Sequence, residues 1–232
     1  MTLDIGFLLF PDVQQLDLTG PYEVFASLPG TRLHLAAERP GPVIASTGLT
    51  LAPTVTFADC PALDVLCVPG GRGVDALLTH APTLAFVRAQ AAQARLVTSV
   101  CTGALVLGAA GLLRGRRATT HWGVHDLLPA FGAIPTQGRL VRDGNLVTGG
   151  GVTAGIDFAL ALAVELVGPV EAEAAGLALE YAPAPPFGSG RPEHASAPVL
   201  AAARARLAPG RRAREAILAE IARHDPHSDA RG

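Results

Sequence analysis

Short runs of nearly continuous hydrophobic residues alternate along this chain with segments whose hydrophobic positions recur at helical spacing. Such runs predict strands covered on both faces, because a strand with one solvated face alternates polar and apolar residues. The predicted strands cover residues 3–10, 32–37, 63–68 and 96–100. The predicted helices cover residues 21–28, 74–78, 84–94, 102–110 and 153–167, the last with Thr153 as its N-cap. This alternation predicts an α/β fold with a doubly wound, mainly parallel sheet and helices on both faces.

Two segments depart from this regular alternation. Residues 42–57 alternate polar and apolar positions between turn signals, and they predict a small antiparallel excursion. Residues 139–142 and 145–148 predict a hairpin that turns at Asp143-Gly144, because Asp-Gly is a strong turn signal.

The last part of the chain has a different composition. After a Pro-rich segment at 182–186, two helices rich in Ala and Arg are predicted at 198–207 and 211–223. We expect residues 1–190 to form one domain and residues 191–232 to be a C-terminal helical extension of it. This extension carries eight Arg and five acidic residues, a pattern typical of an interaction arm or, more commonly, of a solvated helix face.

The overall composition excludes several classes of protein. Hydrophobic residues make up 49% of the 232 residues and charged residues only 16%, which excludes a disordered chain. A net charge of −2 argues against a nucleic-acid partner. All 18 basic residues are Arg, so Schiff-base and phosphate-loop lysine chemistry is excluded.

The N-terminus has no secretory signal pattern, and no apolar run approaches the ~18 residues that span a membrane. We therefore expect no membrane partner. The three cysteines are odd in number and show no CxxC spacing, which predicts free thiols in a reducing, cytoplasmic protein.

The segment LVTSVCTGALVL, residues 96–107, carries the strongest chemical signal. A buried strand leads into Cys101, and the small residues that follow open a helix, as in a nucleophile elbow. A thiol beside a helix N-terminus is expected to favour the thiolate form. The alternative is a buried structural cysteine. Cys67 is predicted to lie in the core and Cys60 in a loop.

Two other segments reach the same sheet edge. Gly70 and Gly71 follow a central strand, and the N–H groups of Gly71 and Thr102 are candidates for a two-donor site for developing negative charge. The alternative is a plain turn. Asp17, in QQLDLTGP after the first strand, is the candidate acid/base partner of Cys101, and its alternative is a helix N-cap.

Two histidines have a spacing that metal ligands can use. His121 and His125 lie four residues apart in HWGVH and could share one face of a helix. No HExxH glutamate and no cysteine cluster accompanies them, so no metal site is predicted.

Four segments together resemble the class I glutamine amidotransferase-like superfamily, which includes the intracellular protease PfpI. They are GFLLFPDVQQLDLTGPYEVF, DVLCVPGG, VTSVCTGALVLGAAGLLRGRRATTHW and VTGGGVTAGIDFAL, and the resemblance spans residues 3–187. Within it, the chain is most similar to the isocyanide hydratases and to the sensor domains of AraC-type regulators. The resemblance implies a flavodoxin-like fold and a homodimer.

It also implies roles for particular residues: Cys101 as the nucleophile, Asp17 as its acidic partner and Thr102 as a hydroxyl beside the nucleophile. Trp122 and Gly150, which lie in the shared segments, are further candidates for substrate contacts, together with Gly70 and Gly71.

The chain departs from three branches of the superfamily. Thr102 stands where the proteases have a histidine, and no His-x-Glu pair of the true amidotransferases appears between residues 150 and 190. Residues 191–232 are too few for the DNA-binding module of the regulators. The resemblance then implies hydration of a small apolar isocyanide to a formamide through a thioimidate on Cys101, without cofactor or metal. A ligand sensor without DNA-binding domain and a glyoxalase or deglycase are the alternatives.

Overall fold

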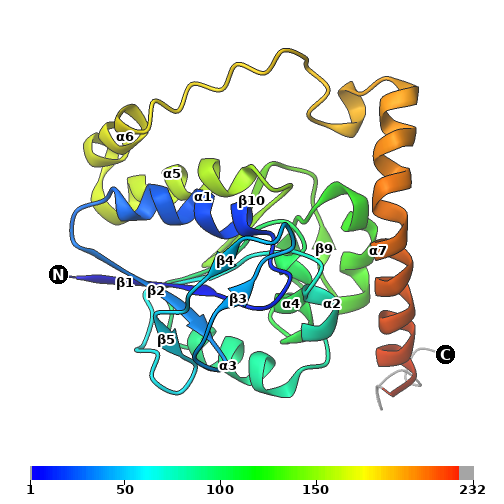
Figure 1. The fold of residues 1–232 in the computed structure, drawn as a ribbon, viewed down its shortest axis with the longest axis horizontal. Coiled ribbons are helices and arrows are strands. Elements are labelled where there is room, and N and C mark those ends of the chain that lie inside the picture. The colour runs from blue at the N-terminus through cyan, green and yellow to red at the C-terminus, as the bar shows by residue number, and fades with distance from the viewer. Residues whose placement is uncertain (1, 225–232) are drawn as a thin grey trace.

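The computed structural model describes residues 2–224 and arranges them around a sheet of seven strands (Figure 1). These strands are Leu3–Leu8 (β1), Thr31–Ala37 (β2), Val55–Thr56 (β5), Val65–Val68 (β6), Leu96–Ser99 (β7), Leu140–Asp143 (β10) and Leu146–Gly149 (β11). They lie in the order β10-β11-β7-β6-β1-β2-β5. Every neighbouring pair is parallel except β10 and β11.

Helices cover both faces of this sheet, so the predicted doubly wound architecture is confirmed (Figure 1). On one face are α1 (Gln15–Ala26) and α5 (Ala154–Val167), with α6 (Pro169–Ala178) beside α5. On the other are α2 (Val74–Leu77), α3 (Ala81–Ala91) and α4 (Gly103–Ala109). The remaining helices are the 3₁₀ segments η1 (Trp122–Phe131) and η2 (Pro192–His194) and the long helix α7 (Ala197–His224).

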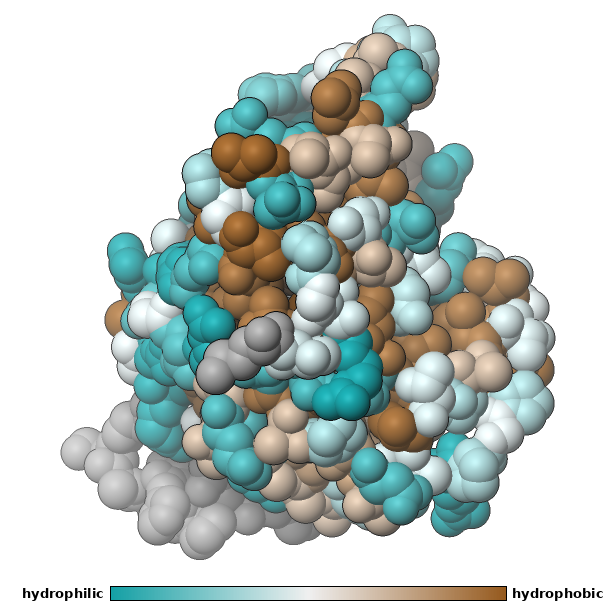
Figure 2. Space-filling model, turned by 90° about the vertical axis from the view of Figure 1, so that its left-hand side faces the viewer, coloured by the Kyte–Doolittle hydropathy of each residue, from teal (hydrophilic) through white to brown (hydrophobic). Residues whose placement is uncertain are grey.

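The side of the molecule near α6 exposes several large hydrophobic side chains. Val164 is 48% exposed, Val170 is 76% exposed and Leu177 is 82% exposed. Figure 2 faces this side and shows hydrophobic residues among polar ones on the surface.

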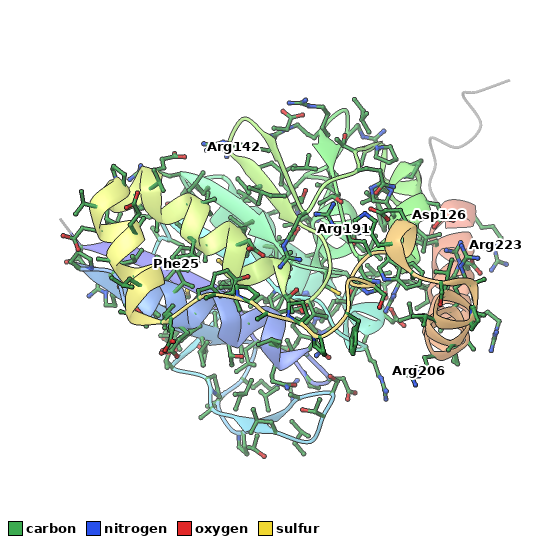
Figure 3. The ribbon with its side chains drawn as sticks, turned by 90° about the horizontal axis from the view of Figure 1, so that it is seen from above. Phe25, Asp126, Arg142, Arg191, Arg206 and Arg223 are labelled. Atoms are coloured by element: carbon green, nitrogen blue, oxygen red, sulfur yellow. The ribbon has the colours of Figure 1, made fainter. Side chains whose placement is uncertain are left out.

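The core fixes α1 and α5 against the sheet. Every residue of β6 and β7 is buried, as their continuous hydrophobic runs predict. Phe25 of α1, labelled in Figure 3, packs against Phe7 of β1 and Phe158 of α5, with both ring-centroid distances 6.3 Å. Burial of one such ring contributes about 1.5–3 kcal/mol. This packing sets the position of α1, and with it the position of Asp17.

Helix α1 begins at Gln15, well before the start predicted at residue 21. Pro21 lies inside the helix and does not end it, and its ring packs so closely on α5 that a Cβ at Gly155 would lie 2.9 Å from Pro21 Cδ. The contact between the two helices compensates for the hydrogen bond that proline cannot donate. Asp17 therefore lies in the first turn of α1 rather than in a loop.

The two helices predicted at 198–207 and 211–223 form the single helix α7, because Pro209 does not end it. Ion pairs hold this helix against the domain. Arg211 Nη2 lies 2.6 Å from Asp126 Oδ2 of η1, and Arg214 pairs with Asp75 of α2. Figure 1 shows α7 along one side of the domain, reached by the segment that follows α6. The end of the predicted extension, residues 225–232, lies outside the described residues.

The predictions for the antiparallel excursion, the hairpin and the N-cap are confirmed in part. Val43–Ile44 (β3) and Thr50–Leu51 (β4) form the antiparallel excursion, but β5 leaves it and pairs parallel with β2. The hairpin turns one residue later than predicted, because Asp143 pairs with Leu146. Thr153 precedes α5 but makes no capping hydrogen bond.

A second small sheet completes the fold. Arg117–Ala118 (β8) pairs parallel with Ile134–Pro135 (β9) in a separate two-stranded sheet. Among residues 2–224, no helix is both long enough and apolar enough to cross a lipid bilayer.

Candidate active site

Cys101 lies in the tight turn between β7 and α4. Its φ of 55° falls in the left-handed region that residues other than glycine rarely adopt. Two hydrogen bonds hold the turn: the Cys101 N–H donates to Gly150 O at 2.8 Å, and Thr120 Oγ1 donates to Cys101 O at 2.6 Å. Gly103 permits the sharp entry into α4, because a Cβ there would lie 2.0 Å from Val68 O. The predicted strand-to-helix elbow is therefore present.

Asp17 reaches this elbow from α1 and is only 1% exposed. Its Oδ2 accepts the Gly70 N–H at 2.9 Å. Its Oδ1 is buried without an N–H or O–H donor among the described residues, and the neighbouring group that interacts with this carboxyl is the Cys101 thiol. Burial raises the pKa of Asp17 to about 7, although the hydrogen bond from Gly70 opposes the rise. A carboxyl with this pKa can take up and release a proton near neutral pH.

The protonation state expected for Cys101 is wrong. Burial raises the pKa of this thiol well above its ordinary value, and the negative charge of Asp17 raises it further. The Thr102 N–H and the charge of Arg214 lower it by smaller amounts. The short helix α4 does not overcome the desolvation of a sulfur on a residue that is only 7% exposed. The Asp17 carboxyl is the acidic group that acts on this thiol, so the two groups are electrostatically coupled.

Thr102 and Gly71 are joined to each other. The Gly71 N–H donates to Thr102 Oγ1 at 3.0 Å, while the Thr102 N–H hydrogen-bonds to the sulfur of Cys101. The two N–H groups that were expected to receive substrate charge therefore have partners within the protein. Gly70 lies so close that a Cβ there would be 2.6 Å from Thr102 N and 2.8 Å from Asp17 Oδ2. Gly70 is thus required by close packing around the Cys101–Asp17 pair, whereas a Cβ at Gly71 would lie 2.4 Å from Asp12 O.

A cavity of about 620 Å³ opens above Cys101. It is lined by Gln14, Gly71, Arg72, Asp75, Cys101, Thr102, His121, Gly123, Val124, Val152, Arg206, Leu207, Pro209, Gly210, Arg211 and Arg214. Its volume is in the range of cavities that hold small organic ligands.

Helix α7 supplies six of these lining residues, and the sequence did not indicate this role. The available signal was the excess of arginine in residues 191–232, which is more commonly typical of a solvated helix face. The contact between α7 and the cavity depends on tertiary packing against η1 and α2.

Four of the candidate residues do not line the cavity: Asp17 and Gly70, which lie behind it, and Gly150 and Trp122. Gly150 accepts the Cys101 N–H and thus supports the elbow from behind. Trp122 is half-buried, and its ring lies 5.5 Å from that of His121, measured between centroids.

The two histidines have separate partners. His121 Nδ1 accepts the Gly123 N–H at 3.1 Å, and His125 Nε2 lies 3.1 Å from Thr136 O. Within residues 2–224, no group of three or more His, Cys, Asp or Glu side chains is arranged to hold a metal ion.

The remaining cysteines lie outside the site. Cys60 is half-buried and Cys67 is buried, and burial raises their pKa values to about 11 and about 12.

Comparisons with known proteins show which proteins this chain is similar to in sequence and in structure. An isonitrile hydratase from Pseudomonas putida is 64% identical over 222 residues, which cover 96% of this chain and 97% of that protein. The transcriptional regulator GbdR from Pseudomonas aeruginosa is 34% identical over 166 residues, or 68% of this chain and 45% of the regulator. The solved structure of a ThiJ/PfpI family protein from Pseudomonas syringae superposes with a TM-score of 0.91 at 44% identity, covering 94% of this chain and 91% of that one.

The family model also matches the part of the chain that holds the site. The model described as the DJ-1/PfpI family matches residues 4–165, a range that includes both Asp17 and Cys101. The chain belongs to the DJ-1/PfpI family.

Proposed function

We propose that this protein is an isocyanide hydratase, which converts R–N≡C and water into the N-substituted formamide R–NH–CHO. The observation that carries the proposal is the buried pair of Cys101 and Asp17, with Cys101 facing the cavity and no histidine beside it in the elbow. The similarity to the isonitrile hydratase of Pseudomonas putida over almost the whole of both chains supports the same activity.

The first half of the reaction forms a covalent intermediate. Asp17 takes the proton of the Cys101 thiol, and the sulfur adds to the terminal carbon of the isocyanide, which forms the C–S bond. Asp17 then returns the proton to that carbon, and the product is the thioimidate R–N=CH–S–Cys101. The Thr102 N–H and the Arg214 charge favour the transient negative charge on sulfur. The pKa of about 7 allows Asp17 to act first as base and then as acid.

The second half hydrates and releases this intermediate. Asp17 takes a proton from water as the water oxygen adds to the thioimidate carbon, and that proton passes to nitrogen. Loss of the hydroxyl proton through Asp17 to sulfur then breaks the C–S bond and forms the carbonyl of the formamide. The unpartnered Asp17 Oδ1 is the oxygen available to hold this water.

The ligand-sensor and deglycase alternatives predict different outcomes when the protein is given a substrate. A ligand sensor would bind an isocyanide or another small molecule without converting it. A glyoxalase would convert methylglyoxal to lactate, and it needs proton transfer between the two carbons of a dicarbonyl substrate. The elbow holds no histidine, and the acid/base group that interacts with Cys101 is the carboxyl of Asp17, which favours the hydratase.

The decisive test compares wild type and Cys101→Ala in a spectrophotometric assay with an aryl isocyanide. We expect turnover to formamide by wild type and none by Cys101→Ala. Cys60→Ala is a matched control, because Cys60 lies outside the cavity, and it should retain wild-type activity. Equal activity of wild type and Cys101→Ala would contradict the proposal, and lactate formation from methylglyoxal would favour the deglycase alternative.

Several broader expectations belong to the same proposal. We propose a homodimer, as the resemblance implies, and a single domain to which α7 belongs. The reaction as written needs no cofactor, no nucleic-acid partner and no membrane partner. Free thiols at all three cysteines support a location in the reducing cytoplasm. Light scattering on the purified protein measures the oligomeric state.

A further inference from the structure

The cavity above Cys101 carries an excess of positive charge. Four arginines line it, Arg72 from the loop after β6 and Arg206, Arg211 and Arg214 from α7. Asp75 is the one acidic residue among the lining residues. An uncharged isocyanide has no group that would form an ion pair with these arginines.

Two of these arginines have ion-pair partners, and two do not. Arg211 pairs with Asp126 and with Glu215, both outside the cavity lining, and Arg214 pairs with Asp75. Within the part of the chain that the structure describes, Arg72 and Arg206 form no ion pair. Their side chains are exposed, so they lie where the cavity meets solvent; Figure 3 labels Arg206 on α7. The mouth of the cavity therefore retains positive charge.

Arg214 is the arginine that lies deepest. It is 7% exposed, and its Nε is engaged by Asp75. Its two terminal nitrogens form no hydrogen bond with residues 2–224 and retain some accessible surface where Arg214 lines the cavity. Buried guanidinium groups usually satisfy several of their donors, and a carboxylate matches the two parallel N–H bonds that arginine offers. Arg214 and Cys101 line the same cavity, and the charge of Arg214 acts on the Cys101 thiol.

The rest of the cavity is suited to a hydrophobic body. Val124, Val152 and Leu207 line it together with the arginines. A ligand that combines an apolar body with one anionic group matches this mixed lining better than either an apolar or a highly charged molecule.

We propose that the substrates of this enzyme are isocyanides that carry a carboxylate, with Arg214 binding the carboxylate and Arg72 and Arg206 attracting it at the mouth. This inference rests on the proposed isocyanide hydration, and it names the substrate class. It replaces the small apolar isocyanide expected from the sequence with an amphiphilic one.

The first test compares 4-isocyanobenzoate with its methyl ester, which has the same body without the charge. We expect wild type to prefer the carboxylate in kcat/KM by about tenfold or more, as one or two charge-assisted hydrogen bonds imply. The preference should shrink as NaCl is added, because salt screens the exposed arginines. Equal kcat/KM values for the two substrates, or a preference for the ester, would overturn the inference and leave the hydratase activity intact.

Variants locate the source of the preference. Arg214→Gln should abolish most of it, and the double variant Arg72→Gln/Arg206→Gln should weaken it several-fold. The readout is the ratio of the two kcat/KM values, because an effect of Arg214 on Cys101 itself acts on both substrates and cancels. Arg204→Gln and Arg212→Gln are matched controls on α7, since neither residue lines the cavity, and both should keep the wild-type ratio. A ratio unchanged by Arg214→Gln would contradict the assignment.

A second measurement does not depend on turnover. Alkylation of Cys101 by iodoacetamide should be slowed by 4-formamidobenzoate and much less by its methyl ester, with the difference lost in Arg214→Gln. Selective protection together with no turnover of either isocyanide would support the carboxylate site and refute the hydratase. Turnover of the ester without selective protection would support the hydratase and refute the carboxylate site.

Discussion

The carboxyl of Asp17 in the first turn of α1 interacts with the thiol of Cys101 in the elbow after β7, and both residues are buried. Helix α1 follows β1 and the elbow follows β7, and these two strands flank β6 in the sheet. The two residues can meet because α1 and the elbow both begin at the carboxyl edge of the parallel strands. Burial raises the pKa values of both groups. In the proposed reaction this coupled pair supplies the acid, the base and the nucleophile.

Asp17→Asn should leave substrate binding nearly unchanged and reduce kcat by about two to four orders of magnitude. Asparagine can still accept the Gly70 N–H, but it cannot take the proton from Cys101. Steady-state kinetics with an isocyanide that wild type converts checks this prediction. Wild-type kcat in Asp17→Asn would mean that another group moves the proton.

The same substitution should stabilise the folded protein at high pH. The pKa of Asp17 is about 7 in the folded state against 3.8 ordinarily, so the folded state binds this proton more tightly than the unfolded chain. Ionisation of Asp17 therefore costs stability as the pH rises from about 4 to about 7, at most by about 4 kcal/mol. The Tm of Asp17→Asn should exceed that of wild type above pH 7, and the difference should vanish below pH 4. A Tm difference independent of pH would show that folding does not raise the pKa of Asp17.

The pH dependence of kcat/KM should report the same group. Below a pH of about 7, Asp17 is protonated and cannot accept the thiol proton, so kcat/KM with a neutral isocyanide should fall about tenfold per pH unit. Above this pH it should reach a plateau. The acidic limb should be absent from the residual activity of Asp17→Asn, and a limb that persists in this variant would assign it to another residue.

Thr102→Val tests the link between the glycine turn and the elbow. Valine keeps the shape of the side chain but leaves the Gly71 N–H without its acceptor, which lies at 3.0 Å in the wild type. A partly buried N–H that loses its partner costs about 1–3 kcal/mol, so kcat/KM should fall at least about fivefold. Thr102→Ser keeps the hydroxyl and is the matched control. The same kcat/KM for the two variants would show that the hydroxyl is not needed.

Much of this architecture could be predicted from the sequence because its signals are local. Continuous hydrophobic runs predict the buried strands, and the small residues after Cys101 predict a tight turn, since Gly103 approaches Val68 O too closely for any side chain. The sheet edge at which Asp17 and Cys101 meet follows from the parallel order of the strands.

Other features depend on contacts between distant segments and could not be predicted. Pro21 is a helix breaker by itself, but packing on Gly155 of α5 allows the helix to begin before it. The thiolate expected from the helix N-terminus was wrong, because desolvation of Cys101 depends on the whole surrounding fold. The composition of α7 is that of a solvated helix. Only the packing of α7 against η1 and α2 brings Arg214 to the cavity.

The central claim is that Cys101 forms a thioimidate with the isocyanide carbon, and intact-protein mass spectrometry measures it most directly. After rapid acid quench of an aryl isocyanide reaction, wild type should carry an adduct of the full mass of the isocyanide, located on Cys101 by peptide mapping. The same adduct should be absent from Cys101→Ala and should form during turnover at least as fast as formamide appears. Formamide production without any adduct on Cys101, or an adduct on Cys60 instead, would contradict the account.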